Sequence, residues 1–165
     1  EYESLNEDFH TRGARSAEQI EVMRALWTQD SIDFEGTWHH IHGAGINPKP
    51  VQQPIPVWIA GASQAAIKRA AEIGDGWIGS PMESDMAKHG EMVDQLKSYA
   101  SEFGRDMDTL GIDGRLSLTN GDPDSHVSDA KAWSDLGATT LTISLSNNTT
   151  FDEGLQEAQQ IAKTL

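Results

Sequence analysis

A turn at Gly61-Ala62-Ser63 holds the residues of this chain whose types and spacing could do chemistry. An apolar run over residues 55–60 ends there, and Gln64 begins a segment of small residues. Glycine lets a ligand approach the main chain, and the first amides of a helix carry unpaired N–H groups and a partial positive charge. Serine can cap that helix or donate its hydroxyl to a phosphate oxygen. The pattern fits an anion-binding turn, and it also fits an ordinary strand-to-helix turn with a serine cap.

The turn requires a strand before it and a helix after it. Prolines at positions 48, 50, 54 and 56 exclude a helix and favour an extended lead-in to a strand over 55–60. A helix is predicted over 63–73, where alanines allow close packing on a sheet and Gly74 provides the stop. A second strand is predicted over 76–79.

The same alternation continues along the chain. Helices are predicted over 14–28, 85–103 and 151–164, and another between Asp122-Pro123-Asp124 and Leu136-Gly137. Further strands are predicted over 112–118 and 139–145, whereas 31–46 is a loop or short hairpin and 1–13 is irregular. Four strands, each followed by a helix, predict an α/β fold with a parallel sheet. A closed eight-stranded barrel takes about 250 residues, so this chain of 165 residues fits half a barrel or a small open sheet.

Apolar spacing predicts which helix faces are buried. Ile20, Met23 and Trp27 form a stripe on the first helix. On the last helix the predicted buried face is Leu155, Ala158, Ala162 and Leu165, and Thr150 with Glu153 fits a capping box. Trp27, Trp58, Trp77 and Trp133 are expected in the core.

The amino-acid composition limits the classes of binding partner and the cellular compartment that we expect. The formal net charge of −14 argues against nucleic acid and anionic membrane surfaces, and no apolar run approaches the length of a membrane span. Residues 41–82, around the turn, are the only segment that is not strongly acidic. The absence of cysteine excludes disulfides and thiolate metal sites and is compatible with a cytoplasmic location. The chain opens at Glu1 without a signal-peptide pattern, which hints at a partial chain.

Several motifs, in one order and spacing, resemble the luciferase-like monooxygenase family. They are Thr11-Arg12-Gly13-Ala14-Arg15, Glu21-Val22-Met23-Arg24-Ala25-Leu26-Trp27, Phe34-Glu35-Gly36, Asn47-Pro48-Lys49-Pro50-Val51-Gln52, Pro56-Val57-Trp58-Ile59-Ala60-Gly61 and Gly74-Asp75-Gly76-Trp77-Ile78. The resemblance implies an oxidoreductase or monooxygenase that uses FMN or coenzyme F420. It also implies a (β/α)8 TIM barrel with the flavin at the carboxyl ends of its strands.

This chain resembles the carboxyl-terminal half of that barrel. We therefore expect a single domain over 1–165, with about four parallel βα units preceded by a helix and a loop or hairpin. The resemblance assigns the cofactor phosphate to Gly61, Ala62 and Ser63, with Gln64 as a further contact. It places Trp77 and Ile78 either at the barrel mouth or in the core. It names no catalytic residue in this chain and implies a small-molecule substrate for the intact enzyme.

Two other overall interpretations stay open. A half barrel leaves strand edges and an inner face uncovered, so it could be a non-catalytic scaffold that pairs with a second copy or with a missing N-terminal half. Such pairing would make the chain a homo-oligomer or part of a larger barrel. Alternatively, the chain is a small doubly wound phosphate-binding domain, which would have a switch point in its strand order.

Three sets of polar residues carry weaker hypotheses. His39-His40 and His42 could hold a metal, but exposed loop histidines are the default, and a hairpin would point His40 and His42 to one side and His39 to the other. Arg12, Arg15 and Glu18 could form ion pairs that brace the first helix. Arg115 lies in a predicted strand. Facing the barrel interior it could bind a phosphate or substrate anion, but we expect the outward-facing, solvated position.

Overall fold

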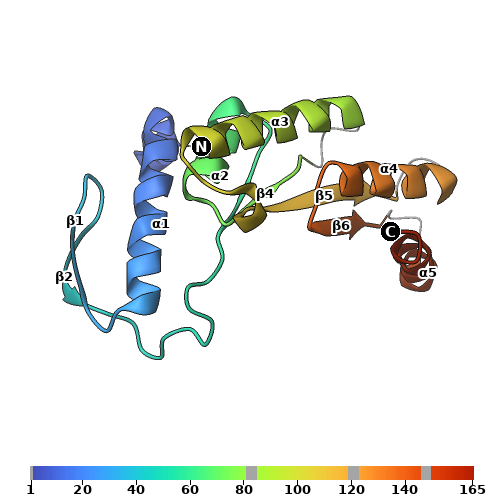
Figure 1. Cartoon of the computed structure of the whole chain (residues 1–165). Coiled ribbons are helices and arrows are strands. Elements are labelled where there is room, and N and C mark those ends of the chain that lie inside the picture. Colours follow the sequence, from blue (N-terminus) through green and yellow to red (C-terminus); the bar gives the residue numbers. More distant parts are fainter. Residues whose placement is uncertain (1, 81–84, 119–122, 146–149) are drawn as a thin grey trace. The chain divides into compact units, whose positions relative to one another are not determined.

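The structure, a computed structural model, describes residues 2–80, 85–118, 123–145 and 150–165. The chain divides into two compact units, Glu1–Val57 and Trp58–Leu165. Figure 1 shows both units, coloured along the sequence. The organisation of residues 1–165 as one domain stays a prediction.

The first unit consists of a helix and a hairpin, preceded by two short 3₁₀ helices. Its elements are η1 (Glu3–Leu5), η2 (Phe9–Thr11), α1 (Arg12–Thr28), β1 (Ile32–Glu35) and β2 (His40–Ala44). Strands β1 and β2 pair antiparallel, so the segment 31–46 is a hairpin. The expectation of an irregular start was wrong for η1 and η2. Asp8 stabilises η2, because its carboxylate accepts the His10 N–H at 2.8 Å.

Helix α1 buries a narrower face than the apolar stripe predicts. Ile20 and Val22 are buried, whereas Met23 is 36% exposed and Trp27 is half-buried. In its own unit α1 packs against little more than η2 and β1. The expected stripe of Ile20, Met23 and Trp27 is therefore only partly covered.

The second unit is a parallel sheet with a helix after each strand. Its elements are β3 (Trp58–Ala60), α2 (Gln64–Ile73), β4 (Gly76–Ile78), α3 (Met86–Glu102), η3 (Met107–Thr109), β5 (Gly111–Ser117), α4 (Pro123–Asp135), β6 (Thr140–Ser144) and α5 (Phe151–Ala162). The strand order β3-β4-β5-β6 is sequential and every neighbouring pair is parallel. A sequential order has no switch point, so the doubly wound alternative was wrong.

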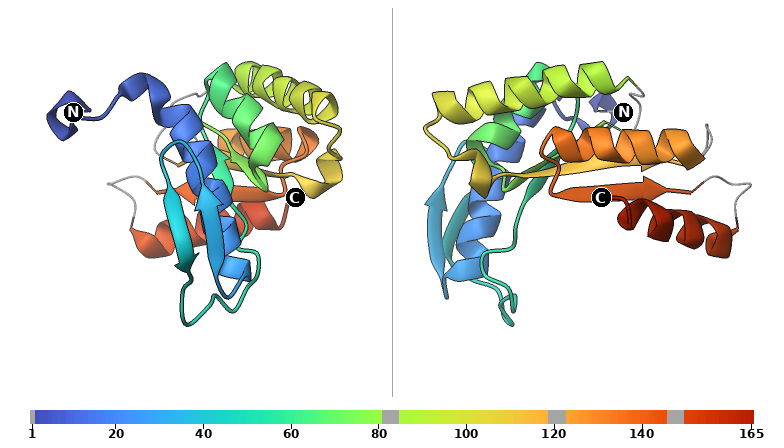
Figure 2. Two further views of the ribbon diagram at one scale, coloured as in Figure 1. Left: turned by 90° about the vertical axis from the view of Figure 1, so that its left-hand side faces the viewer. Right: turned by 45° about the vertical axis from the view of Figure 1, so that its right-hand side comes forward.

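Helices α2, α3 and α4 cover one face of this sheet. Ile112 of β5 packs in a buried cluster with Ile67 of α2 and Leu96 of α3, and Leu116 packs with Ala130 of α4. Figure 2 shows α3 and α4 on the same side of β5. Trp77 and Trp133 are fully buried in the first cluster, as expected for core tryptophans.

Most predicted boundaries around these elements agree with the structure. Ser63 is the N-cap of α2, Gly104 follows α3 with φ +67°, and the capping box of Thr150 and Glu153 is formed. Strand β3 begins at Trp58, later than the predicted residue 55, because Pro54 and Pro56 have no N–H to donate to a neighbouring strand. The predicted start of α4 at Asp122 lies outside the described residues.

The buried face of α5 differs from the predicted one. Gly154 and Ile161 are buried, whereas Leu155 is 44% and Leu165 is 58% exposed. Gly154 faces the side chain of Leu145, where a Cβ atom would overlap it. The helix thus packs through a glycine contact that apolar periodicity does not reveal.

Candidate functional site

The predicted anion-binding turn follows the carboxyl end of β3 and leads directly into α2. Gly61 has φ +137°, a backbone conformation that other residues rarely adopt. A Cβ atom at this position would lie 2.8 Å from the Cβ of Ala66. Gly61 is half-buried, whereas Ala62, Ser63 and Gln64 are exposed. The four residues assigned from the sequence therefore lie together: Gly61, Ala62 and Ser63 form the turn, and Gln64 is the first residue of α2.

Ser63 holds the start of α2. Its Oγ accepts the Ala66 N–H at 3.3 Å, and its carbonyl oxygen accepts the same N–H at 2.9 Å. The amides of Gln64 and Ala65 belong to the first turn of α2. They have no intrahelical acceptor, as at every helix start. The turn thus combines exposed amides with the positive end of a helix, which is the chemistry that an anion requires.

Trp77 supports this turn from the core. Its side chain is fully buried, and its indole N–H donates to the carbonyl oxygen of Gly61 at 2.9 Å. Of the two positions considered for Trp77, the structure selects the core. Ile78 points to the opposite face of the sheet and is half-buried. The link from Trp77 to Gly61 was not foreseen, because the two residues are 16 positions apart.

The sheet face opposite the helices carries a polar cluster. Ile112 and Leu116 face the helices, so Asp113 and Arg115 lie on the other face. Asp113 is 6% exposed, and Thr142 of β6 donates its hydroxyl to the carboxylate, with Oγ1 2.9 Å from Oδ1. Arg115 Nε lies 3.2 Å from Asp113 Oδ2. The expectation of an outward-facing, solvated Arg115 was wrong.

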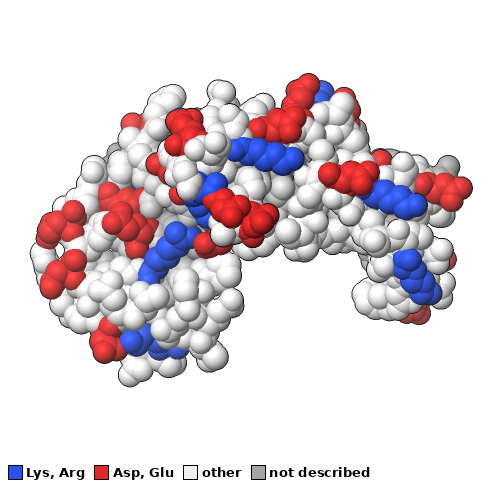
Figure 3. Space-filling view, in the orientation of Figure 1, with Lys and Arg blue, Asp and Glu red and all other residues white. Residues whose placement is uncertain are grey.

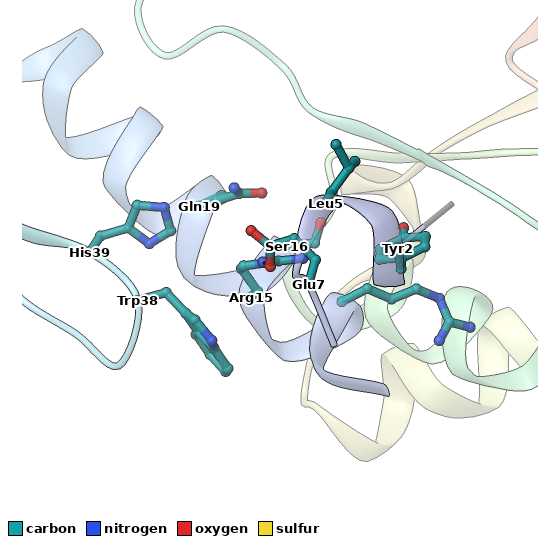
Figure 4. A pocket seen from close by; sticks show the side chains of 9 residues that line it. Tyr2, Leu5, Glu7, Arg15, Ser16, Gln19, Trp38 and His39 are labelled. Carbon is teal, nitrogen blue, oxygen red and sulfur yellow. Dashed lines mark hydrogen bonds and ion pairs between the residues drawn. The ribbon is translucent and has the colours of Figure 1, made fainter. Parts of the chain in front are cut away.

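A separate pocket lies within the first unit (Figure 4). Its lining residues come from η1, α1, the hairpin turn and the segments between them: Tyr2, Leu5, Glu7, Arg12, Arg15, Ser16, Gln19, Trp38 and His39. Its charges are largely engaged with each other or with neighbours. Arg15 forms an ion pair with Glu7, and Arg12 stacks on the ring of Phe9 at 3.7 Å.

Glu18 of α1 binds the hairpin turn instead of the arginines. Its carboxylate accepts the backbone N–H groups of Thr37, Trp38 and His39 at 2.7–2.8 Å and lies 2.8 Å from His39 Nδ1. Desolvation raises the pKa of Glu18, but the hydrogen bonds from His39, Trp38 and Thr37 together outweigh it and lower the pKa from 4.5 to about 2. Of the ion pairs expected from Arg12, Arg15 and Glu18, the described residues show one between an arginine and a carboxylate, Arg15 with Glu7.

The hairpin histidines lie on two sides, as alternation predicts. His40 and His42 both contact Glu35, at 2.8 Å and 3.2 Å, whereas His39 contacts Glu18. Within the part of the chain that the structure describes, no group of three or more His, Asp or Glu residues has the arrangement of a metal site.

A sequence model of luciferase-like monooxygenases matches residues 1–164. The chain belongs to the luciferase-like monooxygenase family. The resemblance carried by the motifs between residues 11 and 78 is thereby confirmed.

The relatives found in this family include dehydrogenases that depend on F420. The chain is 29% identical over 161 residues to the F420-dependent glucose-6-phosphate dehydrogenase of Gordonia bronchialis, covering 94% of this chain and 47% of that protein. It is 32% identical over 135 residues to the enzyme of the same name from Intrasporangium calvum, covering 80% of this chain and 40% of that protein. The chain therefore spans about half the length of the curated relatives it matches.

Solved structures of luciferase-like enzymes share the fold. An F420-dependent secondary alcohol dehydrogenase in complex with an F420-acetone adduct aligns with a TM-score of 0.79 at 13% identity, over 94% of this chain and 62% of that one. EDTA monooxygenase from Chelativorans sp. BNC1 aligns with a TM-score of 0.74 at 13% identity, over 99% and 62%. The predicted partial (β/α)8 barrel of the family, with its preceding helix and hairpin, is thus confirmed.

The face of the molecule shown in Figure 3 carries both signs of charge. On the face shown in Figure 3, Lys and Arg side chains lie beside Asp and Glu side chains and form no continuous basic patch. No helix among the described residues is long and apolar enough to cross a bilayer. The absence of nucleic-acid and membrane partners stays a prediction.

Proposed function

We propose that this chain is the carboxyl-terminal part of a luciferase-like oxidoreductase or monooxygenase and anchors the phosphate of a flavin-type cofactor. The proposed contacts are the amides of Gly61, Ala62 and Ser63 and the hydroxyl of Ser63, with Gln64 as a further contact. FMN and F420 are both candidate cofactors, since relatives are named for F420 and one structural neighbour, a riboflavin lyase, contains a modified FMN. The substrate is a small molecule.

One observation carries this proposal: an exposed glycine–serine turn joins a parallel strand directly to the start of α2. Its residues fit a phosphate group. Gly61 has no Cβ, so an oxygen can approach the main chain, and the helix start supplies amides and positive potential. In (β/α)8 barrels, sites occupy the carboxyl ends of the strands, where this turn lies.

The residues of this chain would orient and insulate the cofactor. When bound, a flavin or deazaflavin supplies hydride transfer or, for a flavin, activation of oxygen. Trp77 would keep the turn rigid, because its indole N–H fixes the Gly61 carbonyl from inside the core. We assign no catalytic residue to this chain. A cytoplasmic location and a single domain over 1–165 belong to the same proposal.

Ser63→Asp tests the phosphate contact. Aspartate is a good N-cap, so α2 should stay folded, while its carboxylate repels phosphate. Fluorescence titration of the 165-residue chain should show that FMN binds more tightly than riboflavin, which lacks the phosphate. Ser63→Asp should raise the Kd for FMN about tenfold and leave riboflavin unchanged. A parallel titration with F420 distinguishes the two cofactors.

Thr150→Asp is the matched control. It places the same carboxylate at the N-cap of α5 and should leave the Kd for FMN and F420 unchanged. Equal affinities for FMN and riboflavin together with no F420 binding, or an equal effect of both substitutions, would contradict the assignment of the phosphate to Gly61–Ser63.

A non-catalytic scaffold is the second candidate function. Strands β3 and β6 are the edges of the described sheet. Phe151 and Leu155 of α5, and Leu165 after its end, have exposed apolar side chains. These features favour association with a second copy or with the residues that complete the barrel. A chain that associates but binds neither FMN nor F420 would fit this candidate alone.

A further inference from the structure

Asp113, Arg115 and Thr142 form a polar cluster on the sheet face opposite helices α2, α3 and α4, called here the open sheet face. Its carboxylate, Asp113, is 6% exposed and is held by Thr142 from the neighbouring strand, with Oγ1 2.9 Å from Oδ1 and 3.1 Å from Oδ2. A buried carboxylate is costly unless it is paired, so Asp113 requires the cation of Arg115 beside it. The cluster therefore fixes Arg115 on the side of the sheet opposite the helices.

The guanidinium of Arg115 is only partly engaged. Its Nε is buried and lies at ion-pair distance, 3.2 Å, from Asp113 Oδ2, but it makes no hydrogen bond within the described part of the chain. Among the described residues, Asp113 is the only carboxylate within ion-pair distance of Arg115. The side chain as a whole keeps 27% of its surface exposed. A guanidinium that is paired with one carboxylate and belongs to a partly exposed side chain keeps N–H donors in a planar fork, which is suited to a carboxylate or phosphate.

Register places Arg115 at the same end of the sheet as the Gly61 turn. Ala60 pairs with Ile78, which pairs with Asp113, and Arg115 lies two residues further toward the carboxyl end. Strands β3 and β5 are separated only by β4, so the two sites are about 10 Å apart across the sheet. A substrate that contacts both the cofactor and Arg115 is therefore of ordinary metabolite size.

We propose that Arg115 is a specificity-determining residue that binds an oxyanion of the substrate, a carboxylate or a phosphate, at the inner face of the barrel. Asp113 and Thr142 act through Arg115 as positioning residues. The identification of the bound anion as substrate rests on the proposed function, because only a cofactor at the Gly61 turn makes this face a reaction site.

The experiment follows the side chain of Arg115 directly by NMR. The ¹⁵N-labelled 165-residue chain is titrated with sodium phosphate, sodium acetate and, at matched ionic strength, sodium chloride. We expect a saturable shift of the Arg115 Nε–Hε resonance with an oxyanion and none with chloride. A response to phosphate alone assigns a phosphate group, and a response to acetate as well assigns the wider oxyanion class. No saturable response to either overturns the proposal.

Two variants separate a binding role from a general charge effect. Arg115→Gln should raise the Kd for the oxyanion about tenfold, measured on backbone amides of β5 and β6. Lys131→Gln removes the same charge from an exposed position on α4 and should leave the Kd unchanged. Equal effects of the two substitutions, or no effect of Arg115→Gln, overturn the proposal. If Arg115→Gln does not fold, the wild-type Nε–Hε titration alone decides.

Ser63→Asp distinguishes this proposal from the proposed function. Phosphate at the Gly61 turn should shift the amides of Ala62 and Ser63, and Ser63→Asp should abolish that shift while the response of Arg115 persists. If phosphate moves only the turn amides, the Arg115 proposal fails and the cofactor anchor survives. If it moves only Arg115, the cofactor anchor fails.

Discussion

Several side chains in this chain form hydrogen bonds with residues that are distant in the sequence. Trp77 fixes the carbonyl of Gly61 at 2.9 Å, Thr142 holds Asp113, and Glu18 binds three consecutive amides of the hairpin turn. In each case a polar group that folding removes from water gains a hydrogen bond from another element of the fold. These contacts position the candidate turn, the open sheet face and the hairpin.

The pKa of Glu18 predicts how the hairpin responds to acid. Its folded-state pKa is about 2 and its ordinary value is 4.5, so its contribution to stability is complete above about pH 4.5 and is lost as the pH falls toward about 2. The amide resonances of Thr37 and Trp38 should titrate with a midpoint near 2 in the wild type. In Glu18→Gln this titration should be absent.

Glu21→Gln serves as the control for this measurement. Glu21 is exposed on the same helix and should leave the amide titration unchanged. A midpoint of Thr37 and Trp38 near the ordinary carboxyl value would mean that Glu18 does not hold the hairpin in solution.

At the scale of elements, glycines in the strands allow one aromatic ring to lie across the sheet. The Trp58 ring occupies the space beside Gly76 of β4 and Gly111 of β5, where a Cβ atom at either glycine would overlap it. The three residues are neighbours in one row of the parallel register. The glycines thus make room for a side chain that connects three strands.

A pair of glycine substitutions with opposite signs tests this packing. Gly76→Ala should destabilise the fold by about 1–3 kcal/mol, because the added methyl overlaps the Trp58 ring. Gly90→Ala should stabilise it by about 0.5–1 kcal/mol, since Gly90 lies inside α3 and its Cβ would make an ordinary contact at 3.7 Å with Leu136. Urea unfolding at constant m-value measures both. If Gly76→Ala leaves the free energy of unfolding unchanged, the Trp58 ring does not occupy this position.

At the scale of the whole molecule, the exposed apolar side chains of α5 predict association. Phe151 is 71% and Leu155 44% exposed, on a helix beside the edge strand β6. Light scattering should show that the 165-residue chain self-associates and that Phe151→Ser with Leu155→Lys shifts it toward the monomer. The control Val51→Lys, at a fully exposed position of the first unit, should leave the association unchanged. A monomeric wild type would contradict the association.

Local patterns were sufficient for the order of elements and for the candidate turn. Proline spacing, small residues and terminal glycines predict β3, α2 and their successors, and the motif string identifies the family. Helix faces were less predictable. On α5 the periodicity of Leu155, Ala158, Ala162 and Leu165 indicates an apolar stripe but not its partner, and contacts at Gly154 and Ile161 bury a different face.

The sequence alone determined that Gly61, Ala62 and Ser63 form a turn between a strand and a helix that starts near Gln64, because those preferences depend on neighbouring residues. Only the tertiary structure decided that Trp77 supports this turn from the core and that Arg115 faces away from the helices beside Asp113. Which side of a strand meets the helices, and which strand lies alongside, depends on register and packing between segments far apart in the chain.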